Sequence, residues 1–145
     1  MNIPTMRGVG STTDQAEIVY VMGYNGTGAE CAQGDVVTLD EGNTYGRTFV
    51  QPETENFNLA YGVLADTVGT AQYTARIVAY GVVQTQCYGV ATNFVPGANL
   101  IMVNDKSYLA YNSAQLDIGQ PRCFTALETN STANQRLRHV FVRAL

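Results

Sequence analysis

The chain has 145 residues and a net charge of −4, and only 14% of its residues are charged, against about 25% in an ordinary soluble domain. A chain of this length can bury a core without a disulfide or a metal ion. The acidic balance argues against nucleic acid as a partner, because phosphate binding draws its affinity from clustered Lys and Arg. The apolar runs fall short of the ~18 residues of a membrane span, so we expect no membrane partner either.

The first sixteen residues contain proline, glycine and a Ser-Thr-Thr run, and they show no periodicity. We expect residues 1–16 to form an extended N-terminal arm outside the core, followed by a single β domain over residues 17–145. Ile3, Met6 and Val9 would be the apolar anchors of this arm, and Arg7 is its positive charge. Such an arm could add a strand to a sheet edge of another protein. The alternative is an unstructured tail.

After the arm, runs rich in Val, Ile and Tyr recur roughly every ten residues and end at turn residues, a spacing typical of a sandwich or barrel. The expected strands lie at residues 17–23, 34–40, 47–51 (a brief edge strand), 57–66, 73–88, 99–103, 107–111, 122–127 and 137–144. The run 73–88 is too long for an ordinary strand and should bend or bulge at Gly81. The predicted fold class is therefore all-β: one compact barrel or sandwich.

The segments between these strands read as turns and loops. Residues 95–98 and 104–106 are predicted turns, the second closing a hairpin, and residues 52–56 are a predicted acidic, irregular loop. No segment keeps a helical period over three turns, so helix should be limited to one short turn near residues 112–116. Tyr-Gly-Val occurs three times, at Tyr61, Tyr80 and Tyr88. The unequal spacing of these copies does not indicate a regular repeat.

The sequence offers few residues for catalysis. His139 is the single histidine, and we interpret it as a structural or interface residue, although a Ser-His-Asp arrangement is not excluded by sequence order. The glycine-rich residues 23–28 lack the Gly-Lys-Ser/Thr ending of a phosphate-binding loop and are read as a hairpin turn. Asp66 with Asp35 or Glu17 is the most that could be offered as a carboxylate pair for glycoside hydrolysis. We predict a protein that is not an enzyme and needs no cofactor or small-molecule substrate.

Two further groups of side chains, the clustered acidic residues and the cysteines, could in principle bind a metal ion or form disulfides. The acidic residues Glu30, Asp35, Asp40, Glu41, Glu53 and Glu55 lack the alternating spacing of a calcium loop, so a solvated acidic face is the better interpretation and no metal is expected. Cys31, Cys87 and Cys123 are odd in number and widely spaced. They predict free buried thiols, which suits assembly in a reducing host cytoplasm.

A basic cluster closes the chain. Arg136, Arg138, His139 and Arg143 lie at the extreme C-terminus, the last three of them in the predicted last strand. The three arginines are candidate interface residues, together with Ile3, Met6, Arg7 and Val9 of the arm. The alternative is an edge strand with solvated arginines on its outer side.

From residue 34 onward the order of strand and turn motifs resembles the head decoration (cement) proteins of tailed bacteriophages. The motifs are GDVV at 34–37, YGVLAD at 61–66, YTARIVAYGVV at 73–83, VPGANL at 95–100, KSYL at 106–109 and the last strand at 138–143. The resemblance implies a barrel or β-tulip-like subunit that forms a homotrimer at three-fold positions and clamps adjacent major capsid protein subunits from outside. The arm of this chain is longer and more polar than the core of that family requires.

The function expected from the sequence is thus that of a structural virion protein on the capsid exterior, which stabilises the expanded shell by binding. A low-charge surface rich in hydroxyl and amide groups suits burial against another protein. The alternatives are a glycan- or receptor-binding β-sandwich, for which nine tyrosines would be suitable, a tail or head-completion subunit, and a small hydrolase.

Overall fold

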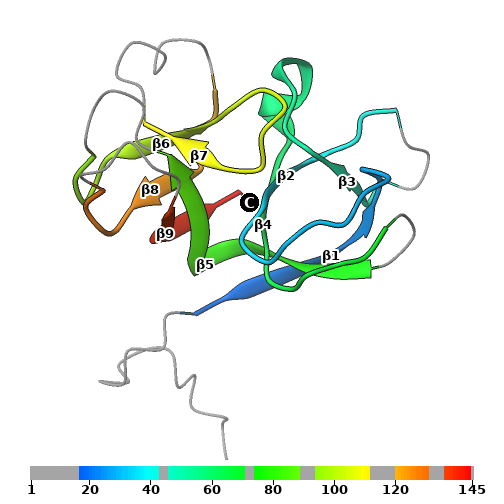
Figure 1. Cartoon of the computed structure of the whole chain (residues 1–145), viewed down its shortest axis with the longest axis horizontal. Coiled ribbons are helices and arrows are strands. Elements are labelled where there is room, and N and C mark those ends of the chain that lie inside the picture. The colour runs from blue at the N-terminus through cyan, green and yellow to red at the C-terminus, as the bar shows by residue number, and fades with distance from the viewer. Residues whose placement is uncertain are drawn as a thin grey trace, which may run out of the picture.

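The structure is a computed structural model that describes residues 17–42, 46–70, 74–88, 94–111, 120–130 and 136–144. Strands make up 53% and helix 6% of it, which confirms the all-β prediction. The elements are β1 Val19–Asn25, β2 Val36–Leu39, β3 Thr48–Val50, the 3-10 helix η1 Thr54–Leu59, β4 Ala60–Leu64, β5 Thr74–Tyr88, β6 Asn99–Met102, β7 Leu109–Ala110, β8 Phe124–Ala126 and β9 Arg136–Arg143 (Figure 1). The predicted arm and the helical turn at residues 112–116 lie outside the described residues.

The first half of the chain closes into a five-stranded barrel in the order β1-β3-β2-β4-β5. β1 and β3 are parallel, the other neighbours are antiparallel, and the first half of β5 returns to pair with β1 and closes the ring. The interior is filled by alternate residues of these strands, since successive side chains of a strand point to opposite faces. Val37, Phe49, Leu64 and Ile77 are buried there in one apolar cluster.

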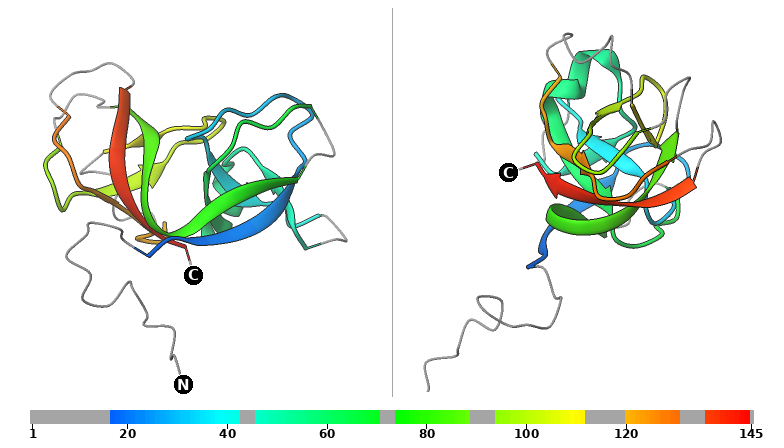
Figure 2. Two further views of the ribbon diagram at one scale, coloured as in Figure 1. Left: turned by 90° about the horizontal axis from the view of Figure 1, so that it is seen from below. Right: turned by 90° about the vertical axis from the view of Figure 1, so that its left-hand side faces the viewer.

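The second half of the chain closes a second ring in the order β5-β7-β6-β8-β9. β5 and β7 are parallel, the remaining neighbours are antiparallel, and β9 returns to pair with the second half of β5. Leu100, Leu109, Phe124 and Val140 are buried in the core of this barrel. The two barrels stand side by side and share β5 (Figures 1 and 2).

The second barrel repeats the first strand for strand. In each barrel the first strand is parallel to the third, and the last strand is antiparallel to the first and the fourth. The repeat extends to isolated bridges, since Cys31 pairs with Val68 in the first barrel and Phe94 pairs with Asn130 in the second. It extends to turns as well: Gly34 has φ 91° and Gly97 has φ 88°. The chain is therefore a tandem pair of equivalent barrels, which the sequence did not reveal.

The shared strand changes partner in its middle. β5 pairs with β1 from Thr74 to Tyr80 and with β9 from Tyr80 onward. Gly81, at this change, has φ 119°, and a Cβ added to it would lie 2.6 Å from the carbonyl oxygen of Glu17. Figure 2 shows β5 curving strongly as it passes from one barrel to the other. The predicted bend at Gly81 is confirmed, and its cause is the need for one strand to serve two rings.

The two barrels pack directly against each other. Val36, Val63 and Val78 belong to the same buried cluster as the core of the second barrel. The buried hydroxyl of Thr85 donates a hydrogen bond of 2.6 Å to the carbonyl oxygen of Gly34. Because the contact is both apolar and hydrogen-bonded, we expect the barrels to unfold together.

Two local predictions were wrong. β3 was expected at an edge, but it lies between β1 and β2, because the parallel pairing with β1 joins residues that are distant in the sequence. The predicted irregular loop at 52–56 partly forms the helix η1, in which the side chain of Asn56 accepts a hydrogen bond from the Glu53 amide at 2.8 Å. By contrast, the turns at 95–98 and 104–106 are present, and β6 and β7 form the predicted hairpin.

Candidate interaction surface

The residues predicted to form an interface fall into two groups. Ile3, Met6, Arg7 and Val9 lie outside the described residues. The arginines of the other group all lie on β9, where Arg136 and Arg143 are exposed and Arg138 is half-buried.

The arginines do not form one cluster. Arg136 and Arg143 stand at opposite ends of β9, about 23 Å apart along an extended strand. Arg138 donates from Nη1 to the carbonyl oxygen of Leu137 at 3.1 Å. The alternative of an edge strand is wrong, because β9 is flanked by β5 and β8.

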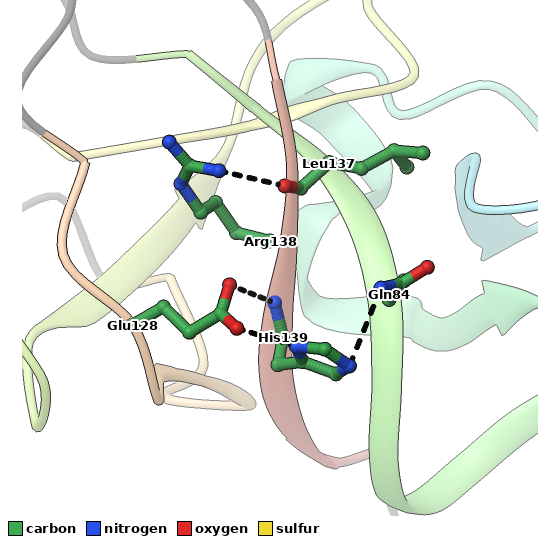
Figure 3. Close-up of polar contacts among 5 residues, drawn as sticks. All are labelled: Gln84, Glu128, Leu137, Arg138 and His139. Carbon is green, nitrogen blue, oxygen red and sulfur yellow. Dashed lines mark hydrogen bonds and ion pairs between the residues drawn. The ribbon is translucent and has the colours of Figure 1, made fainter.

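His139 is held by a carboxylate on one side and an amide on the other (Figure 3). Its Nδ1 lies 2.6 Å from Oε1 of Glu128, and its backbone amide donates to Oε2 of the same carboxylate at 3.1 Å. These hydrogen bonds lower the pKa of Glu128. On the other side of the ring, Nε2 of His139 lies 3.3 Å from the side-chain amide nitrogen of Gln84. In a Ser-His-Asp site this second ring nitrogen would face a hydroxyl nucleophile, whereas here it faces a glutamine amide.

The first barrel has an ion pair at the equivalent place. Arg76 donates to Asp66 through Nε at 2.8 Å and through Nη2 at 2.7 Å, and this fork lowers the pKa of Asp66. Both oxygens of Asp66 are therefore engaged, so it does not resemble a free carboxylate for glycoside hydrolysis. Since each barrel has such a pair, we interpret both pairs as structural features of the repeat.

The glycine-rich segment considered as a phosphate-binding loop also has a structural role. Residues 23–28 form the end of β1 and a turn in which the buried Asn25 donates to the carbonyl oxygens of Ala29 and Gly69 at 2.7 and 2.8 Å. The prediction of a hairpin here was wrong, because β1 pairs with β3 and β5 and not with β2. Among the residues that the structure describes, no group of three or more His, Cys, Asp or Glu side chains is placed to hold a metal ion. Within the same ranges, no helix is long and apolar enough to cross a membrane.

A small cavity of about 160 Å³ lies beside Cys31 and Asp35, with Ser107 of the second barrel on its wall. Burial raises the pKa of the Cys31 thiol and that of the Asp35 carboxyl. A raised pKa keeps a thiol protonated at neutral pH, and the thiol is a poor nucleophile in that form. Cys31 is therefore not an activated nucleophile.

The outer face of β1 carries an apolar stripe that sequence reasoning missed. Ile18, immediately before β1, and Tyr20, Met22 and Tyr24 within it alternate along the chain and are 39%, 45%, 45% and 38% exposed. The guanidinium of Arg76 lies 5.2 Å from the centre of the Tyr20 ring and flanks the stripe. The available signal was the run at 18–22, which is apolar on both faces, whereas a half-solvated strand alternates apolar and polar residues.

The second barrel serves as an internal comparison for this stripe. Met22 pairs with Arg76 on β5, and its counterpart Gln84 pairs with His139 on β9. By the same register, Tyr24 corresponds to Gln86. The barrel fold thus accepts amides at positions where β1 has Met and Tyr, whereas Tyr20 corresponds in the same register to the apolar Val82. The fold therefore does not require Met22 and Tyr24 to be apolar. Exposed apolar patches that the fold does not require mark interaction sites.

No protein-family model matches the chain, and no curated protein matches it.

Proposed function

We propose that this protein is a structural, non-enzymatic component of a virus particle: a decoration protein that binds the outer surface of a tailed-bacteriophage capsid and stabilises the expanded shell. The observation that carries the proposal is the apolar stripe of Ile18, Tyr20, Met22 and Tyr24. It provides a surface for binding another protein chain, either a capsid subunit or a further copy of this chain in the capsid-bound assembly, without any accompanying catalytic constellation among the described residues.

The rest of the surface is consistent with an assembly subunit. Within the described ranges each strand has a neighbouring strand on both sides, which leaves few free edges that could recruit foreign strands. β1 is the exception, because it pairs with β3 only at Tyr24 and Asn25, and its residues 19–23 pair with β5 alone. Contacts are then made by side chains, by this edge of β1 or by the residues before β1. With 14% charged residues, the protein can bury several faces without stranding unpaired charges.

The mechanism of stabilisation would be linkage. A subunit that binds the expanded shell and not its precursor lowers the free energy of the expanded form by RT ln(1 + [L]/Kd). Joining subunits into a trimer multiplies the effect, because the second and third contacts form at a high effective concentration. The partners are then the major capsid protein and further copies of this chain.

The proposal is tested by co-sedimentation of the purified protein with expanded, undecorated shells of its source virus. Saturable binding at a fixed ratio to capsid subunits is the expected result. No binding at about micromolar concentration would contradict the proposal. Binding on a glycan array without affinity for shells would point instead to the glycan-binding alternative, for which Tyr20 and Tyr24 offer exposed rings.

A further inference from the structure

The stripe on β1 has a shape that restricts what can cover it. From Ile18 to Tyr24 it runs about 20 Å along the strand, but it is only one side chain wide. At 38–45% exposure, four side chains of this size leave on the order of 300 Å² of accessible surface. A stable interface between two globular faces buries about 800 Å² on each partner. The stripe is therefore too small to hold a dimer by packing against a second stripe.

A narrow contact of this length suits an extended segment of about six residues. The chain has such a segment outside the described residues. The sixteen residues before Glu17 include the apolar side chains Ile3, Met6 and Val9. They lead directly into the strand that carries the stripe, and when extended they can reach about 50 Å.

We propose that the β1 stripe of one copy is covered by residues 3–9 of a neighbouring copy, so that the copies are joined by exchanged N-terminal arms. The inference rests on the proposed function in one respect, which is that the chain assembles with itself. A stripe covered by its own arm would leave no described apolar surface of this size for that assembly. Contacts between two different surfaces of the same chain close into rings when the rotation allows, which is compatible with a trimer.

The test uses full-length variants and measures oligomeric state by sedimentation velocity, without any capsid. The stripe variant is Met22→Gln with Tyr24→Gln, which copies the residues of the second barrel and should preserve folding. The arm variant replaces Ile3, Met6 and Val9 by Asp. The matched control is Leu137→Gln, which removes an apolar side chain of the second barrel that is 47% exposed.

The wild type and the control are expected to be oligomers, and each of the two variants should weaken self-association by at least about tenfold. Mixing the two variants should restore a heteromeric complex, because one supplies an intact arm and the other an intact stripe. Exchange between copies is contradicted if the mixture stays monomeric, if the arm variant remains as oligomeric as the wild type, or if the wild type is a monomer. Failure of shell binding with intact arm exchange would overturn the proposed function alone.

Discussion

Glu128, two residues after the end of β8, contacts His139 of β9 in the second barrel, and Asp66, two residues after the end of β4, contacts Arg76 of β5 at the equivalent place in the first. The backbone hydrogen bonds beside the two pairs correspond as well, since Ala65 donates to Arg76 at 2.9 Å and Leu127 donates to His139 at 3.0 Å. The ion pairs are thus part of the repeated unit. They differ in geometry: Arg76 donates to Asp66 through two nitrogens of one guanidinium, whereas His139 contacts Glu128 through one ring nitrogen and its backbone amide.

Glu128→Gln should reduce stability in a way that depends on pH. The pKa of Glu128 is lowered below its ordinary value of 4.5 in the folded protein, chiefly by the side-chain hydrogen bond from His139. A carboxyl with a lowered folded pKa contributes stability above its unfolded pKa and loses it as the pH falls through the folded pKa. Because the side chains of His139 and Glu128 are 44% and 42% exposed, the effect should stay below about 1 kcal/mol.

The measurement is urea unfolding of wild type and variant at about pH 6 and about pH 3. The variant should be less stable than the wild type near pH 6, and the difference between the two should be smaller near pH 3. Asp66→Asn in the first barrel is the matched comparison and should show the same trend, because Arg76 lowers the pKa of Asp66. An equal loss of stability at both pH values would contradict the role assigned to the carboxylate.

Thr85→Val tests the junction between the barrels. The hydroxyl of Thr85 is fully buried and donates to the carbonyl oxygen of Gly34 at 2.6 Å, and the Gln86 amide reaches that oxygen only at 3.4 Å. Loss of the hydrogen bond from the Thr85 hydroxyl should lower the free energy of unfolding by about 1–2 kcal/mol. Thr38→Val is the control, because the equally buried Thr38 hydroxyl has no hydrogen-bond partner in the part of the chain that the structure describes. That variant should be neutral or slightly stabilised, and an equal loss in both would refute the junction bond.

Gly81→Ala should disrupt the passage of β5 from one barrel to the other. An alanine would have to adopt a positive φ and place its Cβ 2.6 Å from the carbonyl oxygen of Glu17. The free energy of unfolding, measured by chemical denaturation, should therefore fall by more than about 2 kcal/mol. Gly28→Ala is the control. Gly28 also has a positive φ, of 74°, but a Cβ there has no described atom within 4 Å. The free energy of unfolding of Gly28→Ala should fall by only about 1 kcal/mol. Equal losses in the two variants would contradict a steric clash at Gly81.

The three free cysteines should differ in reactivity. Cys87 is fully buried, and burial raises its pKa to about 12, whereas Cys123 is only partly buried. A thiol reagent attacks the thiolate, so in the native protein Cys123 should react first and Cys87 only upon unfolding. Titration of Cys31→Ser, and of the same variant with Cys123→Ser added, using a chromogenic disulfide near pH 8, measures this difference, because the second variant retains Cys87 as its single thiol. Rapid labelling of Cys87 in the native variant would contradict the burial of this side chain.

Strand positions were predictable because they follow from local pattern. β5, β9 and the β6–β7 hairpin follow from alternating β-branched and aromatic residues bounded by turn residues. The bend at Gly81 followed from the length of its strand. The prediction of free thiols also holds, although Cys123 is less buried than expected.

The tandem repeat could not be predicted, because it is carried by backbone pairing and not by residue identity. Val37 and Leu100 occupy equivalent core positions, and so do Cys31 and Phe94; any residue of suitable volume satisfies such a site. Gly34 and Gly97 are identical since both need a positive φ. One shared glycine in a stretch of changed residues does not reveal a repeat.

The candidate surface was missed for a related reason. A strand with apolar residues on both faces reads as fully buried, so sequence alone could not show that Tyr20 and Met22 face solvent. Only the closure of the first barrel decides which face of β1 is inside. The charged residues drew attention to β9 instead, where the structure keeps Arg136 and Arg143 apart.

The central claim, that this protein stabilises a capsid by binding to it, is tested most directly by the melting temperature of expanded shells with and without saturating protein. Linkage predicts that the melting temperature of the shell rises with protein concentration. At a protein concentration of a hundred times Kd, each occupied site should stabilise the shell by about 2.7 kcal/mol. The Met22→Gln, Tyr24→Gln variant should shift this curve to higher concentration, and Leu137→Gln should not. A shell transition that stays at the same temperature when wild-type protein is bound to saturation would contradict the claim.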